Sequence, residues 1–265
     1  MPRRIKNVIF SGGGLKGWAY IGAIRALNEN IPFKQIEKII GVSAGAVFGL
    51  FYLLQLDYKK LINYFLNMKK ENMIDIDLDA FVVNESISHG IKFKETIQEL
   101  LGIDKDITFK ELYNKTGKIF ITCAFNVTQS SLDYFNKDIT PDLHVVDAIM
   151  ASSALPILFP SYKIGNNYYY DGAICNNCPC NLVNKCESIA FSIGYTVENE
   201  YNIVNLIVSI SKMLNNIMSQ DKSFTYDILD IRYNNENINL NQSKETLFNI
   251  YRNGYKNTKR VLKRI

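Results

Sequence analysis

The sequence has 265 residues, of which 47% are hydrophobic and 21% are charged, with a formal net charge of +4. This balance excludes an intrinsically disordered chain, and the length suits one large domain. The weak positive charge is spread along the chain, so we expect no nucleic-acid partner. There is no apolar run of about 18 residues that could span a membrane, we expect no secretion signal, and the five cysteines are an odd number. We therefore expect an intracellular, cytoplasmic protein with reduced thiols.

The first part of the sequence alternates between strand and helix patterns. We expect a short strand at 6–11, a glycine cluster, and a helix over 18–27 whose apolar residues recur at helical spacing. A buried strand at 36–42 follows, and the apolar run that begins at Ala44 predicts a helix inside the protein. Two successive strand–helix units predict a parallel sheet.

The middle of the sequence, from about 72 to 102, has a looser pattern that predicts a cap or lid with one helix over 92–101. The remaining elements are expected, in chain order, as strands at 118–125 and 132–135, a helix over 145–153, strands at 168–170 and 188–193, a helix over 203–218, a strand at 227–233 and a helix from Ser243. No linker divides the chain. We expect one main domain over 1–195 and a helical extension over 196–265 that packs on it.

Gly12, Gly14 and Gly17 form a GxGxxG pattern between the first strand and the first helix. This pattern is typical of dinucleotide-binding folds, which also need an acidic residue at the carboxyl end of the second strand. Glu37 has a suitable spacing but lies at the start of that strand. The pattern alone therefore does not indicate a dinucleotide site.

A second motif, GVSAG at 41–45, occupies the carboxyl end of the second strand. A tight strand-to-helix turn that exposes Ser43 requires small neighbours, which explains Gly41 and Gly45. The start of the following helix favours the negative charge that develops when the hydroxyl ionises. The first glycine loop lies at the adjacent strand end, where its N–H groups can bind an oxyanion. Together the two motifs indicate a nucleophilic serine, and a buried structural serine is the alternative.

A serine nucleophile needs a base. Neither His89 nor His144 follows an acidic residue that could complete the serine, acid, histidine order of α/β-hydrolases, so we expect solvated or packing roles for both. Asp171, which ends an aromatic strand before Gly172, is the better candidate if burial raises its pKa. The alternative for Asp171 is a turn residue that caps backbone N–H groups.

Four blocks occur in order along the sequence: SGGGLKG at 11–17, GVSAG at 41–45, ASSALPILFP at 151–160 and DGAICNNCP at 171–179. With these blocks, the segment from Val8 to about Leu182 resembles the patatin-like phospholipases. The resemblance implies an α/β fold of three layers, in which a central, mostly parallel sheet is flanked by helices. It also implies these roles: Ser43 as nucleophile, Asp171 as base, Gly12, Gly13 and Gly14 in the oxyanion hole, and Lys16, Gly17, Gly41, Gly45, Gly172 and Ala173 as supporting motif positions. Most members have glycine where this sequence has Ala173.

The resemblance implies hydrolysis of a carboxylic ester in a phospholipid or lysophospholipid at a membrane surface, through an acyl-enzyme and without metal or cofactor. Transfer of the acyl group to another alcohol is an alternative, because only the second nucleophile differs. A lipid-binding protein without catalysis is a further alternative, which the presence of Ser43, Asp171 and the glycine loop disfavours. No feature of the sequence indicates the oligomeric state.

Four cysteines lie close together in and after the last block, at Cys175, Cys178, Cys180 and Cys186. Four thiolates could bind zinc. In the family that the sequence resembles, the first three positions are usually apolar, and free cysteine packs as a small apolar residue. We therefore favour packing over a metal site.

The C-terminal helix is expected to be basic and amphipathic. Helical winding places Leu247, Tyr251, Tyr255, Leu262 and Ile265 on one face and Arg252, Lys256, Lys259 and Lys263 on another. The apolar face is expected to dock on the protein body, and the outward basic face would then be free to attach to an anionic membrane.

Overall fold

The structure is a computed structural model that describes residues 4–67, 86–193, 225–229 and 243–264, together with Ser209 and Met213. Its strands form one mixed sheet in the order β5-β6-β3-β2-β1-β7-β8, and β4 pairs with β3. Five strands are parallel neighbours: β1 (Asn7–Phe10), β2 (Lys38–Gly41), β3 (Ile119–Asn126), β7 (Ser188–Ile193) and β8 (Thr225–Leu229). Three are antiparallel: β4 (Ser131–Phe135), β5 (Tyr162–Ile164) and β6 (Asn167–Asp171).

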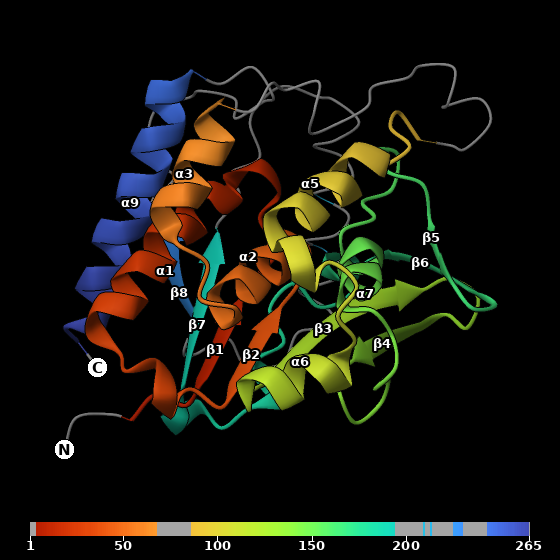
Figure 1. Ribbon diagram of the computed structural model, residues 1–265, viewed down its shortest axis with the longest axis horizontal. Helices are drawn as coiled ribbons and strands as arrows, with labels where there is room; N and C mark the ends of the chain where they lie inside the picture. The colour runs from red at the N-terminus through yellow and green to blue at the C-terminus, as the bar shows by residue number, and fades with distance from the viewer. Residues whose placement is uncertain are drawn as a thin grey trace.

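Helices flank this sheet (Figure 1). They are α1 (Trp18–Asn30), α2 (Ala44–Leu53), α3 (Tyr58–Asn67), α5 (Ile91–Leu101), α6 (Phe109–Thr116), α7 (Val145–Ser152) and α9 (Lys244–Leu262). In Figure 1 the parallel strands point upward, most of the labelled helices lie in front of them, and α9 lies at the left beside α1. The expected α/β architecture with a largely parallel central sheet is confirmed.

The two faces of the sheet bury different residues, because successive side chains of a strand point to opposite sides. Phe10 and Ile39 belong to the large core that includes α1 and α2. Ile9 and Ile40 belong to a second, smaller cluster on the other face, where Cys178 packs against them. The central strands are therefore apolar on both faces, as parallel strands usually are.

Some helices and strands of the structure were not predicted from the sequence. These are α3, α6 and β5, which are short or mixed in polarity. The predicted helix over 203–218 is described only at Ser209 and Met213, both helical, and residues 72–85 of the predicted cap lie outside the described residues. The strand predicted at 227–233 begins earlier, as β8 at Thr225, and the part beyond Leu229 also lies outside them.

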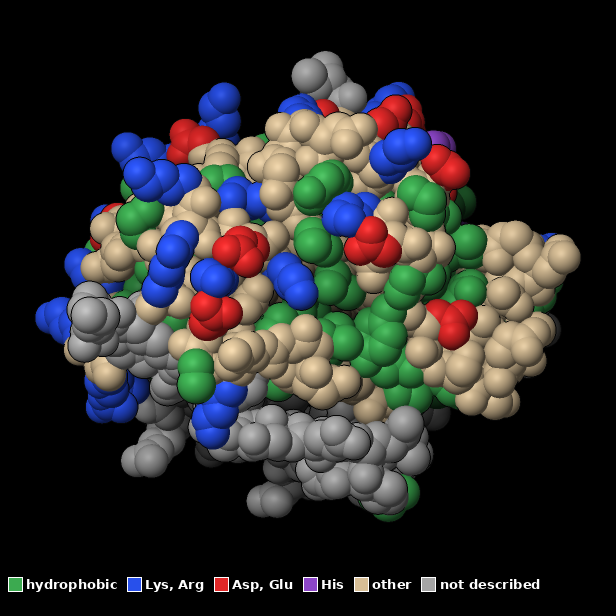
Figure 2. Space-filling view, turned by 90° about the horizontal axis from the view of Figure 1, so that it is seen from below, with side chains coloured by type: hydrophobic (Ala, Val, Ile, Leu, Met, Phe, Trp, Pro, Cys, Tyr) green, Lys and Arg blue, Asp and Glu red, His purple; other side chains and the backbone are tan. Residues whose placement is uncertain are grey.

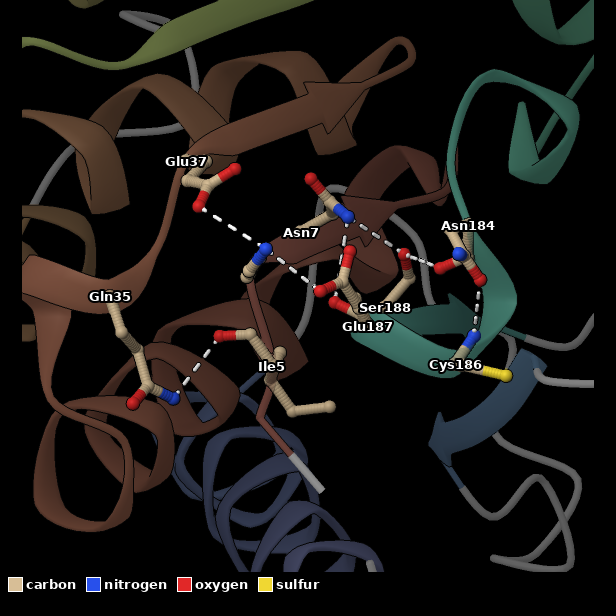
Figure 3. Close-up of polar contacts among 9 residues, drawn as sticks. Ile5, Asn7, Gln35, Glu37, Asn184, Cys186, Glu187 and Ser188 are labelled. Atoms are coloured by element: carbon tan, nitrogen blue, oxygen red, sulfur yellow. Dashed lines mark hydrogen bonds and ion pairs between the residues drawn. The ribbon is translucent and has the colours of Figure 1, made fainter.

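A polar network holds β1 beside β7 at the amino-terminal edge of the sheet (Figure 3). The buried Asn7 side chain donates to Ser188 Oγ at 3.0 Å, and Ser188 donates to the backbone oxygen of Asn184 at 2.5 Å. Lys6 Nζ lies 2.8 Å from a carboxylate oxygen of Glu187. These contacts lie at the opposite end of the strands from Ser43. They therefore hold the register of β1 and β7 without contacting the residues around Ser43.

Helix α9 packs against α1 at very close range. A Cβ atom on Gly254 would collide with the backbone oxygen of Ala19, and one on Gly22 would collide with that of Tyr251. The contact is closed at its rim by Tyr255, whose hydroxyl donates to Glu29 at 2.6 Å. The small residues on both helices therefore let the two backbones meet.

The buried face of α9 differs from the predicted one. Its buried residues are Ile250, Tyr251, Gly254, Thr258 and Val261. Of the predicted apolar face, Tyr251 is buried, Leu247, Tyr255 and Leu262 are half-buried, and Ile265 lies outside the described residues. The prediction placed the buried face from the apolar side chains alone. In the structure Gly254 faces α1, because a residue without a side chain allows the two helix backbones to come closest.

Replacing Gly254 with alanine should destabilise the protein. Helix propensity alone predicts a gain of about 1 kcal/mol for alanine in a helix interior. The collision with Ala19 reverses the sign, and overpacking of this kind costs about 1–3 kcal/mol. Urea denaturation of the Gly254→Ala variant should therefore show a lower free energy of unfolding, while Lys256→Ala, at an exposed position of the same helix, should change little. A more stable Gly254→Ala protein would contradict this packing.

Candidate active site

Ser43 lies in the sharp turn between β2 and α2, with an unusual backbone conformation of φ 54° and ψ −128°. A non-glycine residue at positive φ is strained, and such strain concentrates at functional sites. The turn is tight because glycines stand two residues before and two residues after Ser43. A Cβ atom on Gly41 would collide with the Gly45 carbonyl, and one on Gly45 would collide with the backbone oxygens of Phe10 and Ser11. The half-buried Ser43 side chain is thus presented at the start of α2.

The Ser43 hydroxyl donates a hydrogen bond to Asp171 Oδ2 at 2.7 Å. The Ser43 backbone N–H donates to the Ser152 hydroxyl at 3.0 Å, so side chain and backbone are both held. Ser152 ends α7 and is fully buried. The sequence motifs contained Ser152 but assigned it no role, because nothing in its spacing indicates which backbone group it meets.

The register of the sheet explains why Ser43 and Asp171 meet. Ile40 of β2 pairs with Ile121 of β3, so Ser43, three residues further on, comes level with Ala124. Ala124 pairs with Asp171 of β6. Strand β6 therefore delivers Asp171 to the carboxyl end of β2, although 128 residues separate the two side chains in the sequence.

Asp171 is buried, with 3% of the residue exposed. Burial raises its pKa from 3.8 to about 7, because the charged form loses its hydration inside the protein. The hydrogen bonds from the Ser43 hydroxyl and the Ala173 N–H lower the pKa but only offset part of the rise. The Ala173 N–H donates to Oδ1 at 2.8 Å, which leaves Oδ2 facing Ser43. The carboxyl group is therefore poised to exchange a proton near neutral pH.

The glycine loop lies beside Ser43 at the end of β1. A Cβ atom on Gly12 would lie 3.4 Å from Ser43 Cβ and 2.5 Å from Asn177 Oδ1, and one on Gly13 would lie 2.6 Å from Ile193 Cδ1. The Gly12 N–H already donates to the Asn177 carbonyl at 3.3 Å. Of the three predicted oxyanion donors, Gly13 and Gly14 are therefore better placed than Gly12 to offer a backbone N–H to a ligand.

The remaining motif positions support this geometry. Lys16 and Gly17 lie in the short helix η1 (Gly14–Gly17), where Lys16 is half-buried and a Cβ atom on Gly17 would lie 2.7 Å from the Phe48 ring. Gly172 begins a short helix after β6, and a Cβ atom there would collide with the Cys123 backbone oxygen. Ala173 needs only its N–H for the bond to Asp171, which explains why alanine can stand where glycine is usual.

The histidine and the clustered cysteines lie as follows. The Ser43 hydroxyl donates its hydrogen bond to Asp171, and the His144 side chain faces Asp147 at 3.6 Å. Cys178 and Cys180 are buried with their sulfur atoms 3.6 Å apart. Within the described residues, no three His, Cys, Asp or Glu side chains come together as a metal site.

Comparison with known proteins identifies the family. Residues 8–183 match a family model described as patatin-like phospholipase. The chain belongs to the patatin-like phospholipase family. A protein of Invertebrate iridescent virus 6 described as a probable lipid hydrolase is 33% identical over 192 residues, which cover 69% of this chain and 65% of that protein. Triacylglycerol lipase 4 of Saccharomyces cerevisiae is 26% identical over 234 residues, which cover 74% of this chain and 24% of the lipase.

A solved structure shares this patatin-like fold. VipD from Legionella pneumophila superposes with a TM-score of 0.69 at 14% identity, covering 98% of this chain and 67% of VipD. The chain spans about two thirds of the viral relative and about a quarter of the yeast lipase. Among the described helices, none combines the length and the apolar character needed to cross a bilayer.

The raised pKa of Asp171 predicts a pH profile for ester hydrolysis. A general base must be deprotonated, so kcat/KM should rise with pH along a limb whose midpoint lies near 7. Below that midpoint the rate should fall about tenfold per pH unit, because only the ionised fraction reacts. The measurement is kcat/KM for a soluble ester that does not ionise between pH 5 and 9.

A histidine with an ordinary pKa near 6.5 would give a similar limb, so a control is needed. The double variant His89→Gln, His144→Gln should keep the limb and its midpoint. Loss of the limb in that variant would assign the titration to a histidine and contradict the role of Asp171.

Proposed function

We propose that this protein is a lipid acyl hydrolase of the phospholipase A or lysophospholipase type that uses Ser43 as nucleophile and Asp171 as base. The hydrogen bond of 2.7 Å between the Ser43 hydroxyl and the buried Asp171 carboxylate carries the proposal. Membership of the patatin-like phospholipase family and the names of the lipid hydrolase and lipase relatives support a lipid ester as substrate.

The reaction begins when Ser43 Oγ attacks the ester carbonyl and its proton moves to Asp171 Oδ2. The carbonyl π electrons become an oxyanion, which the N–H groups of Gly13 and Gly14 and the start of α2 stabilise. The intermediate collapses, the alcohol leaves with the proton from Asp171, and the acyl group remains on Ser43. Asp171 then takes a proton from water, which attacks the acyl-enzyme to form a second oxyanion. This intermediate collapses, Ser43 Oγ leaves with the proton from Asp171, and the fatty acid is released. No metal or organic cofactor takes part in these steps.

Acyl transfer to an alcohol is the alternative enzymatic function, because an alcohol can replace water in the second half-reaction. A non-catalytic lipid-binding role would leave the short Ser43–Asp171 bond and the strain at Ser43 without a purpose. Mass spectrometry of a mixed lipid extract after incubation separates these functions. Hydrolysis releases free fatty acid and a lysolipid, transfer produces a new ester, and a binding protein changes no lipid. A product from triacylglycerol but not from phospholipid would replace the phospholipase assignment with a neutral lipase.

Replacing Ser43 with alanine should reduce hydrolysis of a p-nitrophenyl ester at least about 1,000-fold, and Asp171→Asn should be similarly damaging. The double variant should lose little more than either single variant, because the two residues act as one unit. Thermal melting checks that each variant is folded. A folded Ser43→Ala protein with normal activity would refute the proposal.

The substrate of a lipid hydrolase lies in a membrane, so we also propose that the protein binds peripherally to an anionic surface. Figure 2 shows Lys and Arg side chains gathered in the left half of the face seen from below, the side on which α9 lies in Figure 1. Arg252 and Lys256 of α9 and Lys263, which directly follows the helix, are exposed. The charge of Lys259 is partly neutralised, because its Nζ lies 3.8 Å from a carboxylate oxygen of Glu29. Ile250, Tyr251 and Val261 of α9 are buried, whereas Phe248 is exposed. Most of the apolar surface of the helix is therefore used within the protein, and the proposed attachment is electrostatic.

Replacing Arg252, Lys256 and Lys263 together with glutamine should weaken co-sedimentation with anionic vesicles at low salt. Each cation near an anionic surface contributes about 1 kcal/mol before screening. A matched variant with Lys34, Lys105 and Lys110 replaced by glutamine removes the same charge from exposed positions outside α9 and should bind normally. Equal binding of the two variants would refute the role of α9.

A further inference from the structure

We propose that Tyr20 and Ser11 are positioning residues that orient the glycine loop so that the Gly13 N–H points at the developing oxyanion. The inference rests on the proposed function of Ser43. Tyr20 lies in α1 and Ser11 follows β1, and both are fully buried beneath the loop. Neither residue is expected to touch the substrate.

Two buried hydroxyl groups bind two successive carbonyl groups of the loop. The Tyr20 hydroxyl donates to the backbone oxygen of Ser11 at 2.7 Å. The Ser11 hydroxyl donates to the backbone oxygen of Gly12 at 2.9 Å and accepts from the Ile193 N–H at 3.3 Å. The two hydroxyl oxygens lie 3.1 Å apart, and the Tyr20 hydroxyl also lies 3.4 Å from the backbone oxygen of Phe191.

Holding these carbonyls also sets the direction of the next N–H groups. A trans peptide unit is planar, and its C=O and N–H point in opposite directions. The Gly12 carbonyl points to the Ser11 hydroxyl, so the Gly13 N–H of the same unit points away from that hydroxyl. The Ser11 carbonyl points to Tyr20 in the same way, and the Gly12 N–H of that unit meets the Asn177 carbonyl at 3.3 Å.

The loop needs such contacts because glycine restricts its own backbone very little. Gly12 and Gly13 have no side chains that could anchor the segment, yet an oxyanion hole requires donors whose direction is set before the reaction. Backbone bonds restrain part of the loop, namely those from the Ser11 N–H to the Phe191 oxygen at 3.0 Å, from the Gly12 N–H to the Asn177 oxygen at 3.3 Å and from the Lys16 N–H to the Gly13 oxygen at 3.0 Å. The two hydroxyl groups restrain the carbonyl groups of Ser11 and Gly12.

The protein contains a matched control in Tyr52. Tyr20 and Tyr52 are both fully buried, and both pack edge-on against the ring of Phe10. The Tyr52 hydroxyl has no hydrogen-bond partner among the described residues. Replacing either tyrosine with phenylalanine removes one buried oxygen from the same core, but only Tyr20→Phe removes a contact with the loop.

The test compares Tyr20→Phe, Tyr52→Phe and Ser11→Ala with the unchanged protein and with Ser43→Ala. We expect kcat for a soluble ester to fall about 10-fold to 100-fold in Tyr20→Phe, a part of the loss seen when an oxyanion donor is removed, while KM stays within about twofold. Tyr52→Phe should match the unchanged protein. A trifluoromethyl ketone, which adds to Ser43 Oγ and forms an oxyanion without a leaving group, should lose affinity by the same factor as kcat.

Normal kcat in folded Tyr20→Phe, or a kcat loss without a matching loss of ketone affinity, would overturn the inference. If Tyr20→Phe fails to fold, the same two measurements on Ser11→Ala decide, because this change removes the hydrogen bond to the Gly12 carbonyl directly. A failure of the proposed function looks different, since Ser43→Ala would then retain the activity of the unchanged protein. Normal Tyr20→Phe activity together with an inactive Ser43→Ala protein would refute the positioning role alone.

Discussion

The site depends on the fact that β3 extends beyond its parallel neighbour. Strand β3 has eight residues and β2 has four. The first half of β3 pairs with β2, and the second half pairs with β6 in the antiparallel direction. One strand therefore joins the parallel and antiparallel parts of the sheet, and at this junction β6 brings Asp171 level with Ser43. A shift of two residues in the β3–β6 register would move the carboxyl group about 7 Å along the sheet and break the bond to Ser43.

Burial at this junction raises the pKa of the Asp171 carboxyl group, and it also makes the stability of the folded protein depend on pH. The folded protein binds the Asp171 proton more tightly than the unfolded chain, because the folded pKa is about 7 and the ordinary value is 3.8. This contribution to stability is therefore present at low pH and is lost as the pH rises from about 4 through 7. The backbone strain at Ser43 also lowers the stability of the folded protein, because a φ of 54° is unfavourable for a residue other than glycine. The site is thus held by the surrounding packing and does not itself stabilise the fold.

Close backbone approach is the second constraint, and it recurs in places with different purposes. Gly41 and Gly45 let the β2–α2 turn close under Ser43, and Gly22 and Gly254 let α9 lie against α1. The first pair shapes the candidate active site. The second pair anchors the C-terminal helix to α1, the helix that also carries Tyr20. Helix α9 therefore supports, from outside, the helix that contacts the glycine loop from below.

The sequence by itself determined the strand–turn–helix units, the serine turn, the glycine loop and the aspartate, because each depends on local residue types at short spacing. Ser43, Gly41 and Gly45 could be interpreted without a partner, since a tight turn has its own steric requirements. Only the tertiary structure decided what these residues meet. The Ser152 bond to the Ser43 N–H, the Asn177 carbonyl that occupies the Gly12 N–H, and the turning of Gly254 toward α1 all join segments far apart in the chain. Such contacts follow from sheet register and helix packing, and residue spacing along one chain carries no signal for them.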